Sequence, residues 1–179
     1  MLTWELAKMG RRIIDKATFY ILKDRPHRLR PLLKKHAYLL WSDDSLLIFT
    51  AIWNNIKLLP WLLNLGVHPD CRLGKNGNTP LMQAACNNEI ATMKLLINAG
   101  ADVNARNEEN ETPLGFACAW TEWLAAELLI AHGADVNAIE DGRTTFLDWA
   151  ITGSHTEGIR LLTAHGAKRF CELDAENRK

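Results

Sequence analysis

The feature that most constrains this chain is a segment of about 33 residues that recurs along much of its length. Gly66, Gly100, Gly133 and Gly166 each follow a leucine-rich segment, at separations of 34, 33 and 33 residues. The copy at residues 77–107 reads as a turn, a short helix, a tight turn, a longer helix and an extended exit. A unit this short cannot bury the apolar faces of both helices alone, so such units stack on one another. The period therefore predicts an elongated stack with a continuous core.

Three rows of leucines follow the same period and mark the expected core. Each row places a leucine at the same point of successive units, 33 residues apart. Because repeated apolar positions face the neighbouring unit in a stack, we expect these side chains to be buried. The rows are Leu81, Leu114 and Leu147; Leu95, Leu128 and Leu161; and Leu96, Leu129 and Leu162.

The first helix of each unit is expected to begin at a threonine. Thr79 and Thr112 each precede a proline, which has no amide hydrogen to leave unsatisfied at the first helical position. In the last unit the spacing allows either Thr144 or Thr145. After the second helix, Gly-Ala-Asp-Val-Asn predicts a turn in which the asparagine side chain satisfies backbone groups.

Together these motifs resemble the ankyrin-repeat family. The resemblance covers residues 42–170 and implies an all-α solenoid of about four recognisable helix-turn-helix repeats with hairpin loops, preceded by an N-terminal helical cap. Met82, Gly115 and Asp148 stand where the family has the histidine of Thr-Pro-Leu-His, so hydrogen bonding there is expected to differ. The motifs are Thr-Pro-Leu at 79–81 and 112–114, the alanine pair at 84–85, Gly-Ala-Asp-Val-Asn at 100–104 and 133–137, and the leucine doublets.

The chain divides into three parts on this reading. Residues 1–40 form an N-terminal helical cap or a degenerate repeat, and residues 41–170 form the repeat stack. The polar residues 171–179 are expected to be a frayed C-terminal tail. The units of the stack lie near 45–76, 77–108, 109–140 and 141–170.

The net charge of zero hides opposite charges at the two ends of the chain. Residues 1–36 carry ten lysines and arginines against three acidic residues, and residues 37–179 carry eleven against eighteen. The simpler interpretation is the polar outer face that a solenoid cap needs. The alternative is an adaptor that attaches to nucleic acid or an anionic membrane through this basic segment. Nucleic acid is the less favoured partner, because no glycine or aromatic readout motif accompanies the charge.

No catalytic, metal-binding or cofactor-binding residues are predicted, and we do not expect an enzyme. His132 and His165 recur at the repeat period just before a helix-ending glycine, where a histidine suits the helix C-terminus. The four cysteines lack metal-ligand spacing, and Cys118 is expected to be a buried structural thiol. The longest uncharged apolar runs are too short to span a bilayer. These features favour a monomer in the cytoplasm.

Tryptophans that interrupt the repeat are the best candidates for function. The eighth residue after the leading serine or threonine is Trp53, Asn87 or Trp120, on the exposed side of the first helix. Trp41 falls at a hairpin tip in the same register. These side chains either anchor a partner on the concave face or pack against the next repeat. The remaining candidates Trp61, Trp123 and Trp149 are expected in core or semi-core positions.

The hairpin tips are acidic. This charge is either a solvated rim or a means of steering a basic partner. We therefore predict a protein–protein interaction module, in its sharpest form an inhibitor or immunity-type protein acting on a basic enzyme such as a nuclease. The acidic residues are Asp43, Asp44, Glu108, Glu109, Glu111, Glu140 and Asp141, with Lys75 and Arg143 in the same windows. The predicted partner-binding residues are Trp41, Trp53, Asn78, Asn87, Glu108, Glu109, Glu111, Trp120, Asp141 and Arg143.

Overall fold

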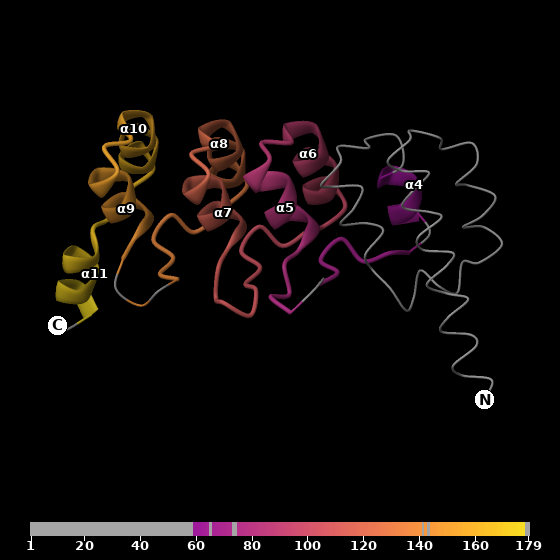
Figure 1. Ribbon diagram of the computed structural model, residues 1–179, viewed down its shortest axis with the longest axis horizontal. Coiled ribbons are helices and arrows are strands. Elements are labelled where there is room, and N and C mark those ends of the chain that lie inside the picture. Colours follow the sequence, from indigo (N-terminus) through magenta and orange to yellow (C-terminus); the bar gives the residue numbers. More distant parts are fainter. Residues whose placement is uncertain (1–58, 65, 73–74, 141, 143, 178–179) are drawn as a thin grey trace.

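The computed structural model describes residues 59–64, 66–72, 75–140, 142 and 144–177 and shows paired helices stacked side by side (Figure 1). The shorter helices α5, α7 and α9 form one row, and the longer helices α6, α8 and α10 form a second row. This arrangement confirms the predicted all-α repeat fold. The helices are α4 (Leu59–Asn64), α5 (Pro80–Cys86), α6 (Ile90–Asn98), α7 (Pro113–Ala119), α8 (Trp123–Ala131), α9 (Phe146–Thr152), α10 (Thr156–Ala164) and α11 (Phe170–Asn177).

A buried threonine caps each helix of the first row, as predicted. The side-chain oxygen of Thr79 accepts the N–H of Met82 at 3.3 Å, and Thr112 accepts the N–H of Gly115 at 3.1 Å. In the last unit the cap is Thr145. Each cap satisfies an N–H group that the first turn of a helix leaves without an intrahelical partner.

Asparagine side chains join consecutive units along the second row of helices. The side-chain oxygen of Asn104 accepts the N–H of Asp135 at 2.8 Å, and that of Asn137 accepts the N–H of Lys168 at 2.8 Å. One unit earlier, the side-chain carboxylate of Asp70 plays the same part and accepts the N–H of Asp102 at 3.0 Å. These bonds explain the recurrence of the motif ending in asparagine, because each exit turn holds the next unit in place.

Two of the three leucine rows are buried, as predicted. The rows of Leu81 and Leu96 have at most 7% of their surface exposed. The row of Leu95 is only half-buried, although it packs against the same core. Neighbouring residues of a helix point about 100° apart, so only one leucine of each doublet can face the adjacent helix directly.

The prediction of a frayed C-terminal tail was wrong for residues 171–177, which belong to α11. Asp148 holds the start of this helix, because its carboxylate accepts the N–H of Phe170 at 2.7 Å and the Nε–H of Arg169 at 2.9 Å. Lys168 forms an ion pair with Glu176 at 2.7 Å. These contacts tie a polar segment to the last repeat.

Several predictions concern residues outside the described part of the chain. These are the N-terminal cap and the sites at Trp41, Trp53, Asp141 and Arg143. Among the residues that are described, no helix is long and apolar enough to cross a membrane.

Candidate functional site

Trp120 is the most exposed aromatic side chain in the described part of the chain, with 63% of its surface open to solvent. It is the C-cap residue of α7, and its N–H donates to the carbonyl oxygen of Phe116 at 3.3 Å. Asn87 and Gly153 are the C-cap residues of α5 and α9. Of the two alternatives for Trp120, the structure shows an exposed indole rather than one packed against the next repeat. Because asparagine and glycine serve equally well at this point, the fold does not require an indole there.

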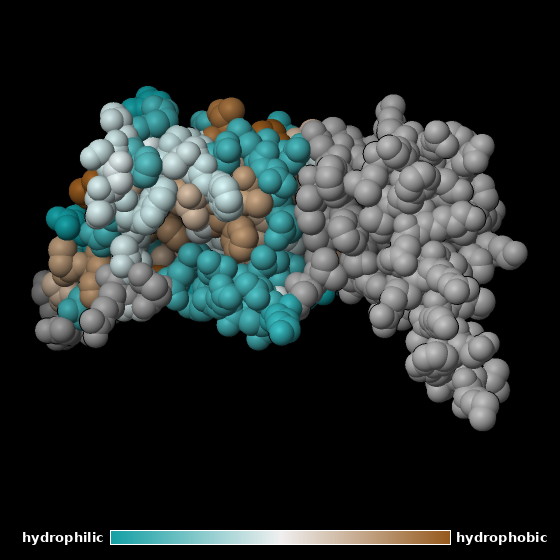
Figure 2. Space-filling view, viewed as in Figure 1, coloured by the Kyte–Doolittle hydropathy of each residue, from teal (hydrophilic) through white to brown (hydrophobic). Residues whose placement is uncertain are grey.

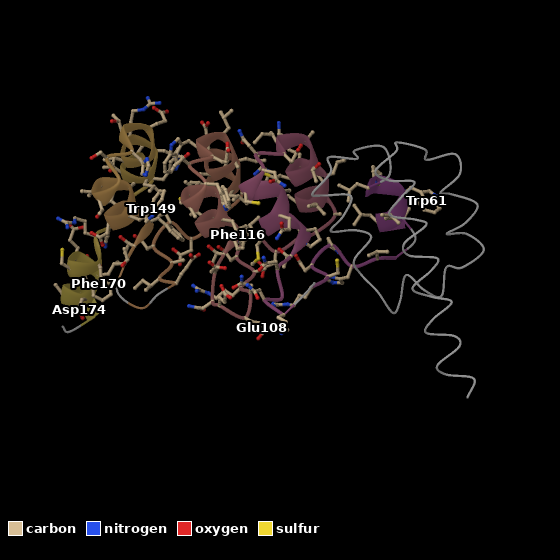
Figure 3. All side chains as sticks on the ribbon, in the orientation of Figure 1. Trp61, Glu108, Phe116, Trp149, Phe170 and Asp174 are labelled. Carbon is tan, nitrogen blue, oxygen red and sulfur yellow. The ribbon has the colours of Figure 1, made fainter. Side chains whose placement is uncertain are left out.

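A groove of about 290 Å³ lies beside Trp120, between the units of α7 and α9. Its apolar wall includes Ala119, which precedes Trp120 in the chain, together with Phe146 and Trp149 from α9. Figure 3 shows Trp149 and Phe116 on neighbouring helices of the same row. Sequence reasoning missed Phe146 and Trp149 as site residues. The sequence did contain a signal for Trp149, because this residue departs from the repeat and stands where α5 has Gln83.

Glu140 forms part of the acidic wall of the groove and occupies a space left by Gly115. Its Oε1 accepts the N–H and the hydroxyl of Thr112, each at 2.7 Å. A Cβ added to Gly115 would overlap this carboxylate. Burial raises the pKa of Glu140, and the nearby charge of Glu111 raises it further, while the hydrogen bonds from Thr112 oppose the rise. Glu140 is therefore a fixed acidic group rather than part of a solvated rim.

Two further carboxylates on the groove, Glu109 and Glu111, are held by asparagine amides. The side chain of Asn76 donates to Glu109 at 2.8 Å, and the side chain of Asn107 donates to Glu111 at 2.8 Å. Asn107 also donates to Asn78 at 2.7 Å. Asn78 thus has a structural part in the loop, and its predicted role in binding stays a prediction.

The loop ends carry negative charge that the described part of the protein does not pair with a cation. Figure 2 shows hydrophilic residues over the loop ends and more neutral or apolar residues above them, over α7 and α9. Glu108 and Glu109 are exposed. Among the described residues, the ion pairs are Arg160 with Glu157, Lys168 with Glu176 and Arg169 with Asp148, none of which lies at these loop ends. The surface is therefore acidic beside an apolar strip.

An aromatic cluster supports the groove from the side of the second row. His155 stacks on Trp149 with ring centroids 4.6 Å apart, and Trp123 lies 6.4 Å from Trp149. Both tryptophans are half-buried, as predicted, and so is Trp61 in α4. The rings lie over glycines, since a Cβ at Gly153 would overlap His155 and one at Gly158 would overlap Trp123.

His132 and Cys118, whose side chains could suggest catalysis or metal binding, have structural roles. His132 Nδ1 lies 2.8 Å from the carbonyl oxygen of Leu128 at the end of α8, as predicted for a helix C-terminus. Cys118 is buried, and burial, together with the charge of Glu140, raises its pKa to about 12. The described residues contain no group of three or more histidine, cysteine or acidic side chains that could hold a metal ion.

Six of the ten predicted partner-binding residues are described by the structure. Trp120, Glu109 and Glu111 lie at or beside the groove, and Glu108 is at the same loop end. Asn87 is exposed at the equivalent point of the preceding unit. The structure thus gathers four of these six residues on the face of α7 and its loop.

The chain matches a known family of repeats but no curated protein. The model for ankyrin repeats, which describes three copies, matches residues 25–107, 47–140 and 92–172. The first match begins upstream of residue 41, where the sequence alone places the start of the stack. No curated protein matches the chain significantly. Because the family matches span most of its length, the chain belongs to the ankyrin-repeat family.

Proposed function

We propose that this protein is a non-catalytic cytoplasmic module that binds a partner protein through the face formed by α5, α7, α9 and their loop ends. Ankyrin repeats are generally protein–protein interaction modules and are generally non-catalytic. The observation that carries the proposal is the exposed indole of Trp120, at a position where the neighbouring units have Asn87 and Gly153. Large aromatic side chains with few rotatable bonds are frequent anchors of interfaces.

The charge beside Trp120 supports a partner with a basic surface. Glu108 and Glu109 are exposed next to the groove, and unpaired charge of one sign steers a partner of the opposite sign. A basic enzyme held inactive by this protein is the sharpest form of the proposal. The alternative, attachment to nucleic acid or an anionic membrane, concerns the basic residues 8–35, which lie outside the described part of the chain.

Photo-crosslinking from two equally exposed positions tests the proposal. A photoreactive phenylalanine analogue replaces Trp120 in one variant and Leu124 in the other; both native side chains are 63% exposed, but Leu124 lies on α8 in the second row. We expect position 120 to crosslink a defined protein in cells of the source organism and position 124 not to do so. Equal yields from both positions, or none from position 120, would refute the proposed face.

Affinity for the purified crosslinked protein then measures the contribution of the anchor. Trp120→Ala should weaken binding at least tenfold, which corresponds to about 1.4 kcal/mol, whereas Leu124→Ala should leave binding unchanged. Circular dichroism and the urea midpoint of both variants should match those of the unsubstituted protein. An unchanged affinity in Trp120→Ala would contradict the role given to this residue.

A further inference from the structure

The groove between the units of α7 and α9 has walls of different chemistry. The carboxylates of Glu109, Glu111 and Glu140 and the aromatic rings of Phe146 and Trp149 line the same groove. Its volume of about 290 Å³ lies at the lower end of the range for ligand pockets. A groove of this size has room for one large side chain rather than for a folded segment.

The three carboxylates are positioned by neutral donors. Each has one oxygen in a hydrogen bond of 2.7 or 2.8 Å, given by Asn76, Asn107 or Thr112. None of the three carboxylates forms an ion pair within the described part of the chain. The neutral donors fix the carboxylates in place without compensating their charge.

Burial makes this uncompensated charge costly. Desolvation raises the pKa of Glu140, and repulsion from Glu111 adds to the rise, while Arg106 lowers it from a distance without an ion pair. A cation placed in the groove would relieve both effects, because an opposite charge nearby stabilises the ionised carboxylate. Charge complementarity therefore indicates that the groove binds a cationic group.

A groove lined by both carboxylates and aromatic rings favours a guanidinium over an ammonium group. A guanidinium is planar, carries five N–H donors that can reach more than one carboxylate, and stacks favourably on an aromatic wall. A lysine ammonium is a compact, strongly hydrated point charge and gains less from an indole such as Trp149. We propose that this groove binds an arginine side chain of the partner protein. This proposal rests on the proposed function and adds to it the group on the partner that the groove recognises.

Titration of the full chain with a minimal probe tests this recognition. The probe is N-acetylarginine methylamide, followed by the indole N–H signals of Trp149 and Trp120 in NMR spectra. We expect a saturable shift at Trp149 and binding at least tenfold weaker for the neutral isostere N-acetylcitrulline methylamide. The lysine counterpart should bind at least threefold more weakly than the arginine probe. Equal affinity for citrulline, or tighter binding of lysine, would overturn the proposal.

Charge-matched variants locate the binding. Glu111→Gln and Glu140→Gln each keep an acceptor oxygen for their donors, Asn107 and Thr112, but remove one charge. Each should weaken arginine binding at least fivefold. Glu127→Gln removes the same charge from an exposed position on α8 and should have no effect. If Glu111→Gln, with unchanged circular dichroism, retains full affinity, the arginine is not bound by these carboxylates.

The two proposals fail in distinguishable ways. If the arginine probe does not bind while position 120 still crosslinks a partner selectively, only the arginine assignment is wrong. If the probe binds but positions 120 and 124 crosslink alike, the groove recognises arginine and the proposed docking face is wrong.

Discussion

The carboxylate of Glu140 stands in the space that a side chain at Gly115 would need. Gly115 lies in the first turn of α7, whereas Glu140 comes from the loop before the next unit. The Glu140 Oε1 atom accepts two hydrogen bonds from Thr112, which caps α7. A residue from the loop after α8 thus completes the cap of α7.

This relationship predicts that Gly115→Ala destabilises the protein although alanine favours helices. The substitution gains about 1 kcal/mol in helix propensity. It also displaces Glu140 and breaks hydrogen bonds to a charged group, worth roughly 1.5–3 kcal/mol each. We expect a net loss of about 2–5 kcal/mol in the free energy of unfolding, measured by urea denaturation.

A double-mutant cycle provides the control. In a Glu140→Ala background there is no carboxylate to displace, so Gly115→Ala should be neutral or stabilising by up to about 1 kcal/mol. Additive effects of the two substitutions would show that the two residues are not coupled.

Trp123 and Gly158 form a second pair that links neighbouring units. Gly158 is buried in α10, and a Cβ there would overlap the ring of Trp123. Gly158→Ala should therefore lower the free energy of unfolding by about 1–3 kcal/mol through overpacking, despite its helix propensity. Thr163→Ala, at an exposed position of the same helix, should be neutral or slightly stabilising. A loss that persists in a Trp123→Leu background would argue against this contact as the cause.

Thr121 carries backbone strain beside the proposed anchor. Its φ of 59° lies in the left-handed region, which disfavours β-branched residues, while Asn88 has φ 55° at the equivalent position. Asparagine tolerates this region, so Thr121→Asn should raise the free energy of unfolding by roughly 1 kcal/mol. The reciprocal Asn88→Thr should lower it by a similar amount in the same thermal or urea assay. If Thr121→Asn and Asn88→Thr both have the same free energy of unfolding as the unsubstituted protein, the turn is not strained.

Features that repeat with the period were predictable from the sequence. The caps at Thr79 and Thr112, the buried leucines and the role of Asn104 all recur, because every unit meets the same neighbours. The same register singled out the position of Trp120, but it left open whether the indole is exposed or packs against the next repeat. Repetition thus identifies the scaffold, and departures from it identify candidate surfaces.

Pairs that occur once could not be assigned from the sequence. Gly115 was recognised as a departure from the family pattern, but nothing local indicates that Glu140 fills the space. Asp148 is a similar case, because its partner Phe170 lies at the end of the predicted stack, directly before the segment that resembles a polar tail. Such contacts join residues 22 to 28 positions apart in the sequence, and they occur where one unit differs from the others, so the repeated motif does not encode them.

The carboxylate of Asp148 predicts how the C-terminal end responds to pH. Burial opposes its ionisation, but hydrogen bonds from Arg169, Phe170 and Thr145 outweigh burial and lower its pKa. A lowered pKa in the folded state contributes stability above the ordinary aspartate value of about 4, and that stability is lost as the pH falls through the lowered value. Asp148→Asn should therefore reduce stability at pH 7, and its difference from the unsubstituted protein should shrink below about pH 4.

Hydrogen exchange gives this prediction a local measurement. The amide of Phe170 donates to Asp148 at 2.7 Å, so in Asp148→Asn its exchange at pH 7 should accelerate by at least tenfold, together with that of α11. Glu140→Gln is the control of opposite sign. The pKa of Glu140 is raised by burial, so removing its charge should favour folding increasingly as the pH rises above the ordinary glutamate value. If Asp148→Asn differs from the unsubstituted protein by the same amount at every pH, ionisation of this carboxylate does not hold α11 in place.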